Sequence, residues 1–355
     1  MTLKKAGIFF FVFLFLLTTA LSFVPGHNGD MPYYIAAVFE RQGMSESEAL
    51  SAAKAVISTE MKPAESGSHI YHLNNAEKNI LEYYRIKPLY VLSIYLLHQL
   101  GFSFIKATLI PSLISFFFIG FFVFAWTAKV FRPLPACIFS MILMLMNPAI
   151  ILARLSSPDP ISNLLLFICL YRIYFQKRYS WTAVLLFVSL FVRLDNFIAV
   201  MVLLPVMFFW PEKKAPVRMP FPFFITGILL TIVICICINF YFENNFWWFK
   251  RVSYIQSPLA YGYQVLVFCL SVSQSFLPPL LLMGLLAYFY HKSSMDKKIV
   301  IMLGGIGCII FFRFLLFPSF EERFFAAFYL CGFLLVLELL TRDKKMDIQM
   351  IGHHD

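Results

Sequence analysis

Long uninterrupted apolar runs are the feature of this sequence that most constrains its fold. A helix needs about 17 to 25 apolar residues to cross the hydrocarbon core of a bilayer. Such runs recur along the 355 residues, of which 60% are hydrophobic and 14% are charged, whereas an ordinary soluble domain carries about 25% charged residues. We therefore expect an all-α, polytopic membrane protein, and the composition excludes soluble nuclear, cytosolic and secreted proteins.

The apolar runs predict about ten transmembrane helices. The expected spans are 6–24, 104–128, 135–152, 161–175, 181–193, 197–210, 221–242, 263–290, 299–317 and 324–341. We expect the first run to be an uncleaved anchor rather than a cleaved signal peptide, because many spans follow it. The chain then divides into a transmembrane domain, 1–341, and a short cytoplasmic tail, 342–355. The pair at 181–210 leaves two alternatives, a short helical hairpin or one long span with Arg193 and Asp195 at its centre.

Two polar stretches separate these runs, 25–87 and 243–262. In the first, Ser45 and Glu48 have the spacing of a capping box, and apolar residues follow at helical spacing, which predicts an amphipathic helix over 46–61 on the membrane surface. The run 89–100 is too short to cross, so we expect a second interfacial helix there.

The distribution of charge predicts the orientation. The formal net charge is +10, but the chain has no dense basic stripe and no nucleic-acid-binding motif, so we expect no nucleic-acid partner. With the N-terminus in the cytoplasm, the whole excess of positive charge falls on the cytoplasmic side, as the positive-inside rule requires. The stretches 25–87 and 243–262 then lie outside.

The remaining ionisable residues collect on this expected outer face, from separate loops. They are Asp30, Arg85, Lys87, Asp159, Arg193, Asp195, Glu321, Glu322 and Arg323. A carboxylate can take a proton from an attacking hydroxyl or hold a metal, and a cation can hold a phosphate leaving group. The set suits transfer chemistry on a lipid phosphate.

Each of these residues also has a purely structural alternative. Asp30 and Asp159 each precede a proline at an expected helix start, where a carboxylate caps well. Arg193 and Asp195 can form a local ion pair that closes a helical hairpin. The segment that carries Arg323 can be a solvated turn.

The order of several short motifs resembles that of a known family. They are Gly29-Asp30-Met31-Pro32-Tyr33-Tyr34, Lys87-Pro88-Leu89-Tyr90, Pro158-Asp159-Pro160, Val192-Arg193-Leu194-Asp195-Asn196 and Arg323 before the last span. In this order the chain resembles the GT-C superfamily of integral-membrane glycosyltransferases over roughly 5–340. Within that superfamily it resembles particularly the bacterial relatives of the protein O-mannosyltransferases and the lipid A aminoarabinose transferases.

The resemblance implies an enzyme of the bacterial cytoplasmic (inner) membrane with its active site facing the periplasm. It implies transfer of a sugar from a polyprenyl-phosphate donor to a lipid, glycan or protein acceptor. Asp30 matches the catalytic base, and Asp159 matches a second carboxylate that assists the acceptor or a divalent metal ion, the one cofactor to consider. The residues that match, or lie beside, the family's phosphate-binding positions are Arg85, Lys87, Arg193, Asp195 and Arg323.

One departure from the family pattern bears on the acceptor, and one alternative function stays open. Met31 stands where relatives often have a second acidic residue, so the acceptor is not identified. The alternative is a transporter or flippase of a lipid-linked or charged solute, which requires ionisable groups at mid-membrane positions.

Overall fold

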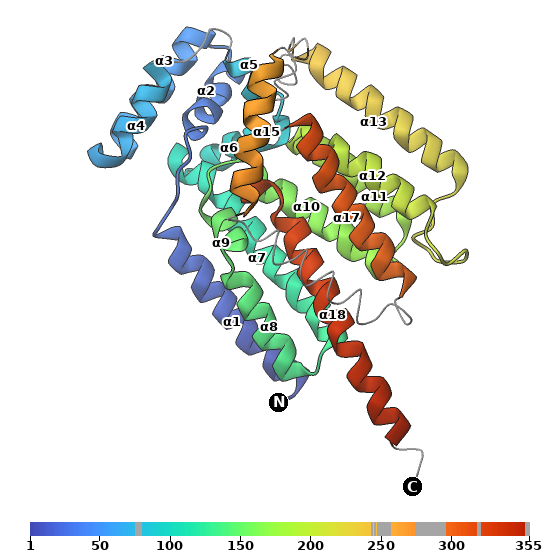
Figure 1. Cartoon of the computed structure of the whole chain (residues 1–355). Coiled ribbons are helices and arrows are strands. Elements are labelled where there is room, and N and C mark those ends of the chain that lie inside the picture. The colour runs from blue at the N-terminus through green and yellow to red at the C-terminus, as the bar shows by residue number, and fades with distance from the viewer. Residues whose placement is uncertain are drawn as a thin grey trace.

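The computed structural model is built of helices throughout the residues that it describes, 1–74, 80–242, 244, 246, 257–273, 296–317 and 321–351 (Figure 1). The helices are α1 (Leu3–Ser22), α2 (Met31–Arg41), α3 (Glu46–Glu60), α4 (Pro63–Asn74), α5 (Leu81–Arg85), α6 (Pro88–Gln99), α7 (Phe104–Val130), α8 (Pro133–Leu145), α9 (Asn147–Arg154), α10 (Asp159–Tyr174), α11 (Tyr179–Val192), η1 (Leu194–Asn196), α12 (Phe197–Phe208), α13 (Phe221–Tyr241), α15 (Pro258–Ser273), α17 (Lys297–Leu316), η2 (Glu322–Phe324) and α18 (Ala326–Ile351). The second half of the expected span 263–290 and most of 243–256 lie outside the described residues.

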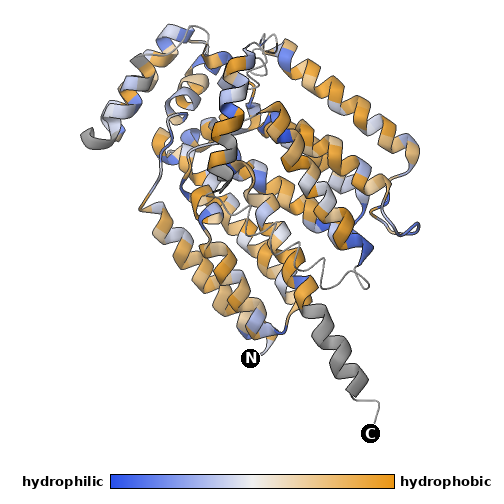
Figure 2. Cartoon of the chain, viewed as in Figure 1, coloured by the Kyte–Doolittle hydropathy of each residue, from blue (hydrophilic) through white to orange (hydrophobic). Residues whose placement is uncertain are grey.

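Apolar helices long enough to cross a membrane support a multi-pass membrane protein. Four qualify by length and composition, namely α1, α7, α13 and α17, and α8 with α9 makes a fifth if the bent pair is one span. Apolar residues cover these helices, while polar residues gather at their ends (Figure 2). The expected count of about ten is not reached in the described part of the chain, because α10, α11, α12 and the apolar part of α18 are shorter than 18 residues.

The expected single span 135–152 is broken instead. Helices α8 and α9 meet at a bend of 60°. Met146 between them is extended, with φ −66° and ψ 144°, and a proline stands in the first turn of α9. In a continuous helix, Pro148 could not donate to the carbonyl of Met144, and its ring would clash with that carbonyl, so Pro148 accounts for the break.

Residues 179–208 form a helical hairpin, which decides between the two alternatives of the sequence. Arg193 ends α11 with extended torsions, φ −149° and ψ 119°. The backbone N–H of Tyr179, at the start of α11, donates to the carbonyl of Pro216 beyond the end of α12 at 3.1 Å. The two helices therefore run back along each other, with Arg193 and Asp195 at the turn.

Close packing joins the first helix to the centre of the molecule. Phe10 of α1 stacks on Phe124 of α7, with ring centroids 5.0 Å apart. Leu14 lies directly over Gly120, where a Cβ atom would stand 2.7 Å from both of its methyl carbons. Glycine allows this approach because it has no side chain.

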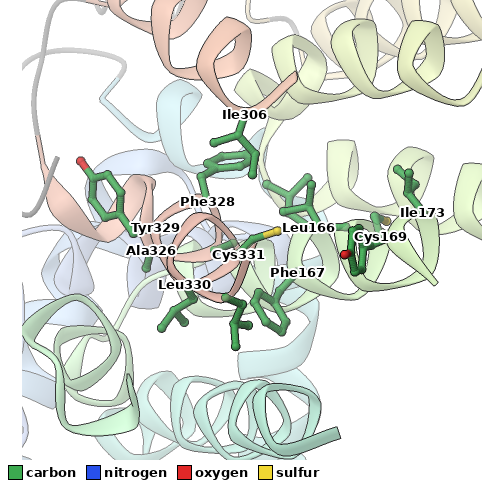
Figure 3. Close-up of a cluster of buried hydrophobic side chains, with 14 of the residues drawn as sticks. Leu166, Phe167, Cys169, Ile173, Ile306, Ala326, Phe328, Tyr329, Leu330 and Cys331 are labelled. Atoms are coloured by element: carbon green, nitrogen blue, oxygen red, sulfur yellow. The ribbon is translucent and has the colours of Figure 1, made fainter. Parts of the chain in front are cut away.

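A second part of the core joins α10 to α18. Leu166 and Phe167 of α10 face Phe328 and Cys331 of α18, and Ile306 of α17 closes the cluster (Figure 3). Asp159 is the first residue of α10, and Arg323 lies just before α18. This packing therefore places the charged ends of the two helices beside each other.

The segment 25–87 forms a separate helical layer. The predicted helix at 46–61 is α3, and both bonds of its capping box, between Ser45 and Glu48, are present. Its apolar face, which includes Ala49, Ala53 and Ile57, packs in a shared cluster with α2. The face that was expected to lie on the membrane is thus covered by protein in the structure.

Candidate functional site

Asp30 precedes α2 but does not cap it. Its side chain makes no bond to the free N–H groups of the helix. Tyr84 donates its hydroxyl to one carboxylate oxygen at 2.8 Å, and Asn28 donates to the other at 3.1 Å. The second oxygen also lies 3.8 Å from a terminal nitrogen of Arg323, and the side chain is 35% exposed. Asp30 is thus a positioned carboxylate at the edge of a larger network.

Asp159 lies inside that network. Its side chain is 3% exposed and forms an ion pair with Arg193. Ser157 donates a hydroxyl to its second oxygen at 2.9 Å, and Nε of Arg323 lies 3.3 Å from the same oxygen. The carboxylate is engaged by two cations rather than by the N-terminus of α10.

Asp195 joins two arginines. Arg193 donates to it twice, from Nε at 2.9 Å and from Nη2 at 2.8 Å. Arg313, near the end of α17, donates to the same carboxylate from Nη1. Fork geometry of this kind is the strongest form of a charge-assisted hydrogen bond. The local pair predicted from sequence exists, and it extends across to α17.

Three guanidinium groups surround one phenyl ring. The Cζ atoms of Arg193, Arg313 and Arg323 lie 4.4, 4.6 and 5.0 Å from the centroid of the Phe324 ring. The face of an aromatic ring attracts cations, so the ring helps to hold three positive charges close together. Arg323 forms a further ion pair with Glu321.

Two asparagines fix the turns that carry these arginines. Asn163 of α10 donates to the carbonyl of Arg323 at 2.8 Å and accepts from the backbone N–H of Ala327 at 2.8 Å. Asn196 donates to the hydroxyl of Ser162 at 2.9 Å, which ties the hairpin turn to α10. The charged groups are therefore held by rigid helix ends.

Lys87 lies beside the network in an aromatic enclosure. Its ammonium is buried and donates to the hydroxyl of Tyr34 at 3.0 Å. It lies 3.8 Å from the ring centroid of Tyr83 and 4.9 Å from that of Tyr84. Burial lowers the pKa of Lys87 from 10.5 to about 7, and the carboxylate of Asp30 opposes this shift. No contact recorded among the described residues joins Lys87 directly to a carboxylate.

Arg85 stands apart from the other expected residues. Its guanidinium pairs with Glu40 at 3.4 Å and with Glu82 at 3.8 Å. Both partners belong to the segment 25–87. Glu40 lies near the end of α2, whereas Asp30 precedes its beginning. The structure thus brings together Asp30, Asp159, Arg193, Asp195 and Arg323, and leaves Arg85 outside.

The described residues offer no group of three or more His, Cys, Asp or Glu side chains that could hold a metal ion. The carboxylates of Asp159 and Asp195 instead meet guanidinium groups. The arrangement can hold anions on its arginines and can accept a proton on Asp30.

Sequence reasoning missed Arg313, Tyr84 and Asn163. Arg313 is buried, and it had a visible signal, because a charged residue inside an apolar run is a functional candidate by default. Tyr84 and Asn163 gave no such signal, since tyrosine and asparagine are common at helix ends.

No protein-family model, curated protein or solved structure matches the chain. The resemblance to the GT-C superfamily therefore stays a prediction from short motifs.

Proposed function

We propose that the protein is a membrane glycosyltransferase that moves a sugar from a polyprenyl-phosphate donor to a lipid, glycan or protein acceptor. Asp30 is the catalytic base. The proposal includes about ten membrane crossings, a bacterial inner-membrane location and a site that faces the periplasm. The resemblance in motif order and the charge distribution of the sequence support these finer points.

One observation carries the proposal, the different surroundings of three carboxylates. Asp159 and Asp195 are 3% and 13% exposed and are each engaged by two arginines. Asp30 is 35% exposed, and a single cation stands 3.8 Å from it. Of these three carboxylates it is therefore the one that an acceptor can reach, with Arg323 beside it. Glu321, which is 49% exposed, is a fourth carboxylate but is bound directly to Arg323.

The chemical step follows from this pairing. Asp30 takes the proton of an acceptor hydroxyl, whose oxygen attacks the anomeric carbon of the donor sugar. The bond from that carbon to the phosphate oxygen breaks, and both of its electrons leave with the polyprenyl phosphate. Arg323, 14% exposed at the same edge, stabilises the negative charge of the leaving group.

The test compares a deletion strain restored with wild type, Asp30→Asn or Glu46→Gln at matched protein levels in the membrane. Extracted lipids and surface glycans are compared by mass spectrometry. Glu46 belongs to the first turn of α3 in the same segment, so Glu46→Gln is the matched control. We expect wild type and Glu46→Gln to restore a missing hexose-type mass, and Asp30→Asn to restore none. Full restoration by Asp30→Asn would refute Asp30 as the base.

One observation favours the alternative, a transporter or flippase. Glu338 is a buried carboxylate within the apolar part of α18, about 18 Å along the helix from Ala326 at 1.5 Å per residue. A relay through the membrane would need such a group. Under this alternative Glu338→Gln fails to restore the deletion strain, whereas Asp30→Asn restores it. The transferase proposal expects the reverse.

A further inference from the structure

A cavity of about 540 Å³, lined by both polar and apolar side chains, lies where the segment 25–87 meets the end of α13. The last turns of α2, the end of α5, the beginning of α6 and the end of α13 line it. Glu40, Arg41 and Arg85 supply charged groups, and Tyr241 and Phe242 supply aromatic rings. The network around Asp159 contributes none of the lining residues in the described part of the chain.

The cavity stands at the end of a membrane-spanning helix. Tyr241 is the last residue of α13 and is 81% exposed. Phe240 and the apolar side chains along the helix, such as Val233, are exposed as well, as expected where lipid surrounds a helix. Aromatic residues favour the level of the lipid headgroups. Asn244 donates to the carbonyl of Glu82 at 2.7 Å and fixes this end of α13 against α5.

Arg85 has bonding capacity left over in this cavity. Its Nη1 and Nη2 atoms face Glu40 and Glu82, at the long distances of 3.4 and 3.8 Å. Its Nε atom is buried and has no hydrogen-bond partner, and a buried donor without a partner is costly. The guanidinium fork matches two oxygens of one phosphate, and Arg41 brings a second cation to the same lining.

The carboxylate of Glu40 is a group that an incoming anion would displace from Arg85. Burial raises the pKa of the Glu40 carboxyl, although Arg85 opposes this shift. Glu40 is thus a carboxylate that competes with any anion for Arg85 and holds its own charge less firmly than an exposed carboxylate does.

We propose that this cavity binds a phosphate group through Arg85 and Arg41, and that the phosphate belongs to the headgroup of a membrane lipid. The lipid chains leave the cavity beside Tyr241 and lie along the exposed apolar face of α13. A free phosphate would meet the same two arginines, so the experiment separates the two sources. The inference is independent of the proposed transferase activity and of Asp30.

The test titrates the full-length, delipidated protein in detergent with 1-palmitoyl-2-oleoyl phosphatidylglycerol and counts bound lipid by native mass spectrometry. The comparison lipid is the matching diacylglycerol, which lacks the phosphate, and a third titration uses inorganic phosphate alone. The variants are Arg85→Gln, Glu40→Gln and, as matched control, Arg218→Gln, a half-buried arginine before the other end of α13.

We expect phosphatidylglycerol to bind the wild type at least about tenfold more tightly than diacylglycerol does, the worth of one charge-assisted hydrogen bond. Arg85→Gln should lose this preference and Arg218→Gln should keep it. Glu40→Gln should bind phosphatidylglycerol several-fold more tightly than wild type, a gain that misfolding cannot produce.

Two results would overturn the proposal. One is equal affinity of wild type and Arg85→Gln for phosphatidylglycerol, and the other is equal binding of the two lipids by the wild type. Binding of inorganic phosphate that depends on Arg85, without binding of phosphatidylglycerol, would keep the phosphate site and overturn the lipid as its source.

Discussion

Removing the charge of Asp195 should destabilise the protein more than removing the charge of Arg313, although the two form one ion pair. Asp195 accepts two bonds from Arg193, at 2.9 and 2.8 Å, and one from Arg313. Asp195→Asn therefore removes the recorded carboxylate partner of the buried Arg313 and leaves Arg193 with Asp159 alone. Arg313→Gln removes one donor, and Asp195 keeps its paired bonds to Arg193.

The magnitudes follow from these contacts. Breaking a buried ion pair from one side costs about 3–5 kcal/mol, because the partner charge stays buried. We assign this cost to Asp195→Asn. A single hydrogen bond to a charged group is worth about 1.5–3 kcal/mol, and Arg313→Gln should lie at the low end since it also removes a buried charge. The double variant should be about 1–2 kcal/mol more stable than the sum predicts, because Arg313 is no longer there to be left unpaired.

The measurement is equilibrium unfolding in mixed micelles of mild and denaturing detergent, followed by far-UV circular dichroism. Asp30→Asn is the control, because its carboxylate is 35% exposed and its ion pair is long, at 3.8 Å. That variant should change the free energy of unfolding by less than about 1 kcal/mol. The reasoning is refuted if Arg313→Gln costs as much as Asp195→Asn, or if the two substitutions are additive.

Three further predictions concern pH, helix packing and a helix cap. Burial lowers the pKa of Lys87 to about 7, so between that pH and about 10.4, the pKa of lysine in the unfolded chain, the unfolded chain binds a proton that the native state lacks. Stability should therefore rise with pH across this window by at most about 1.4 kcal/mol per unit. Lys87→Met should flatten this rise in unfolding titrations, and equal slopes would contradict the prediction. Gly120→Ala forces a methyl group to 2.7 Å from two carbons of Leu14 and should cost about 1–3 kcal/mol, with partial recovery in Leu14→Ala; an unchanged melting temperature would show that α1 shifts freely. Ser45→Ala removes the capping bond from the N–H of Glu48 and should cost about 1 kcal/mol. Hydrogen exchange in the first turn of α3 should then be faster than in the wild type, while exchange in α7 is unchanged.

Sequence reasoning performed best where one physical signal dominated. The run 104–128 corresponds to α7, Phe104–Val130, because a long apolar stretch can do little except form a helix in lipid. The capping box at Ser45 is equally local. The break at Met146 was missed because hydropathy alone does not register that Pro148 has no N–H to donate to the preceding turn.

The candidate site was likewise predicted only in part from the sequence. Expected helix ends on one face of the membrane were enough to bring Asp30, Asp159 and Arg323 into one neighbourhood, but they carry no information on distance. Arg85 lies on the same segment as Asp30 and yet turns to Glu40, since the pairing of α2 with α5 decides its direction. Arg313 enters only through the crossing of α17 over the hairpin turn, which is a tertiary property.

The balance of charge within the network separates residues that hold the fold from residues that are free to react. Asp159 and Asp195 offset Arg193 and Arg313 inside the protein, so an incoming phosphate gains little by displacing them. Asp30 stands at the edge, and its long contact of 3.8 Å with Arg323 costs little to open, while Arg323 keeps its ion pairs with Asp159 and Glu321. Asp195→Asn should therefore reduce stability and activity together, whereas Asp30→Asn should abolish activity in a protein that unfolds like the wild type. Activity per folded molecule, measured for both variants, distinguishes the two roles. If the Asp30→Asn protein lost activity only because it unfolded, Asp30 would have a structural role and would not be the base.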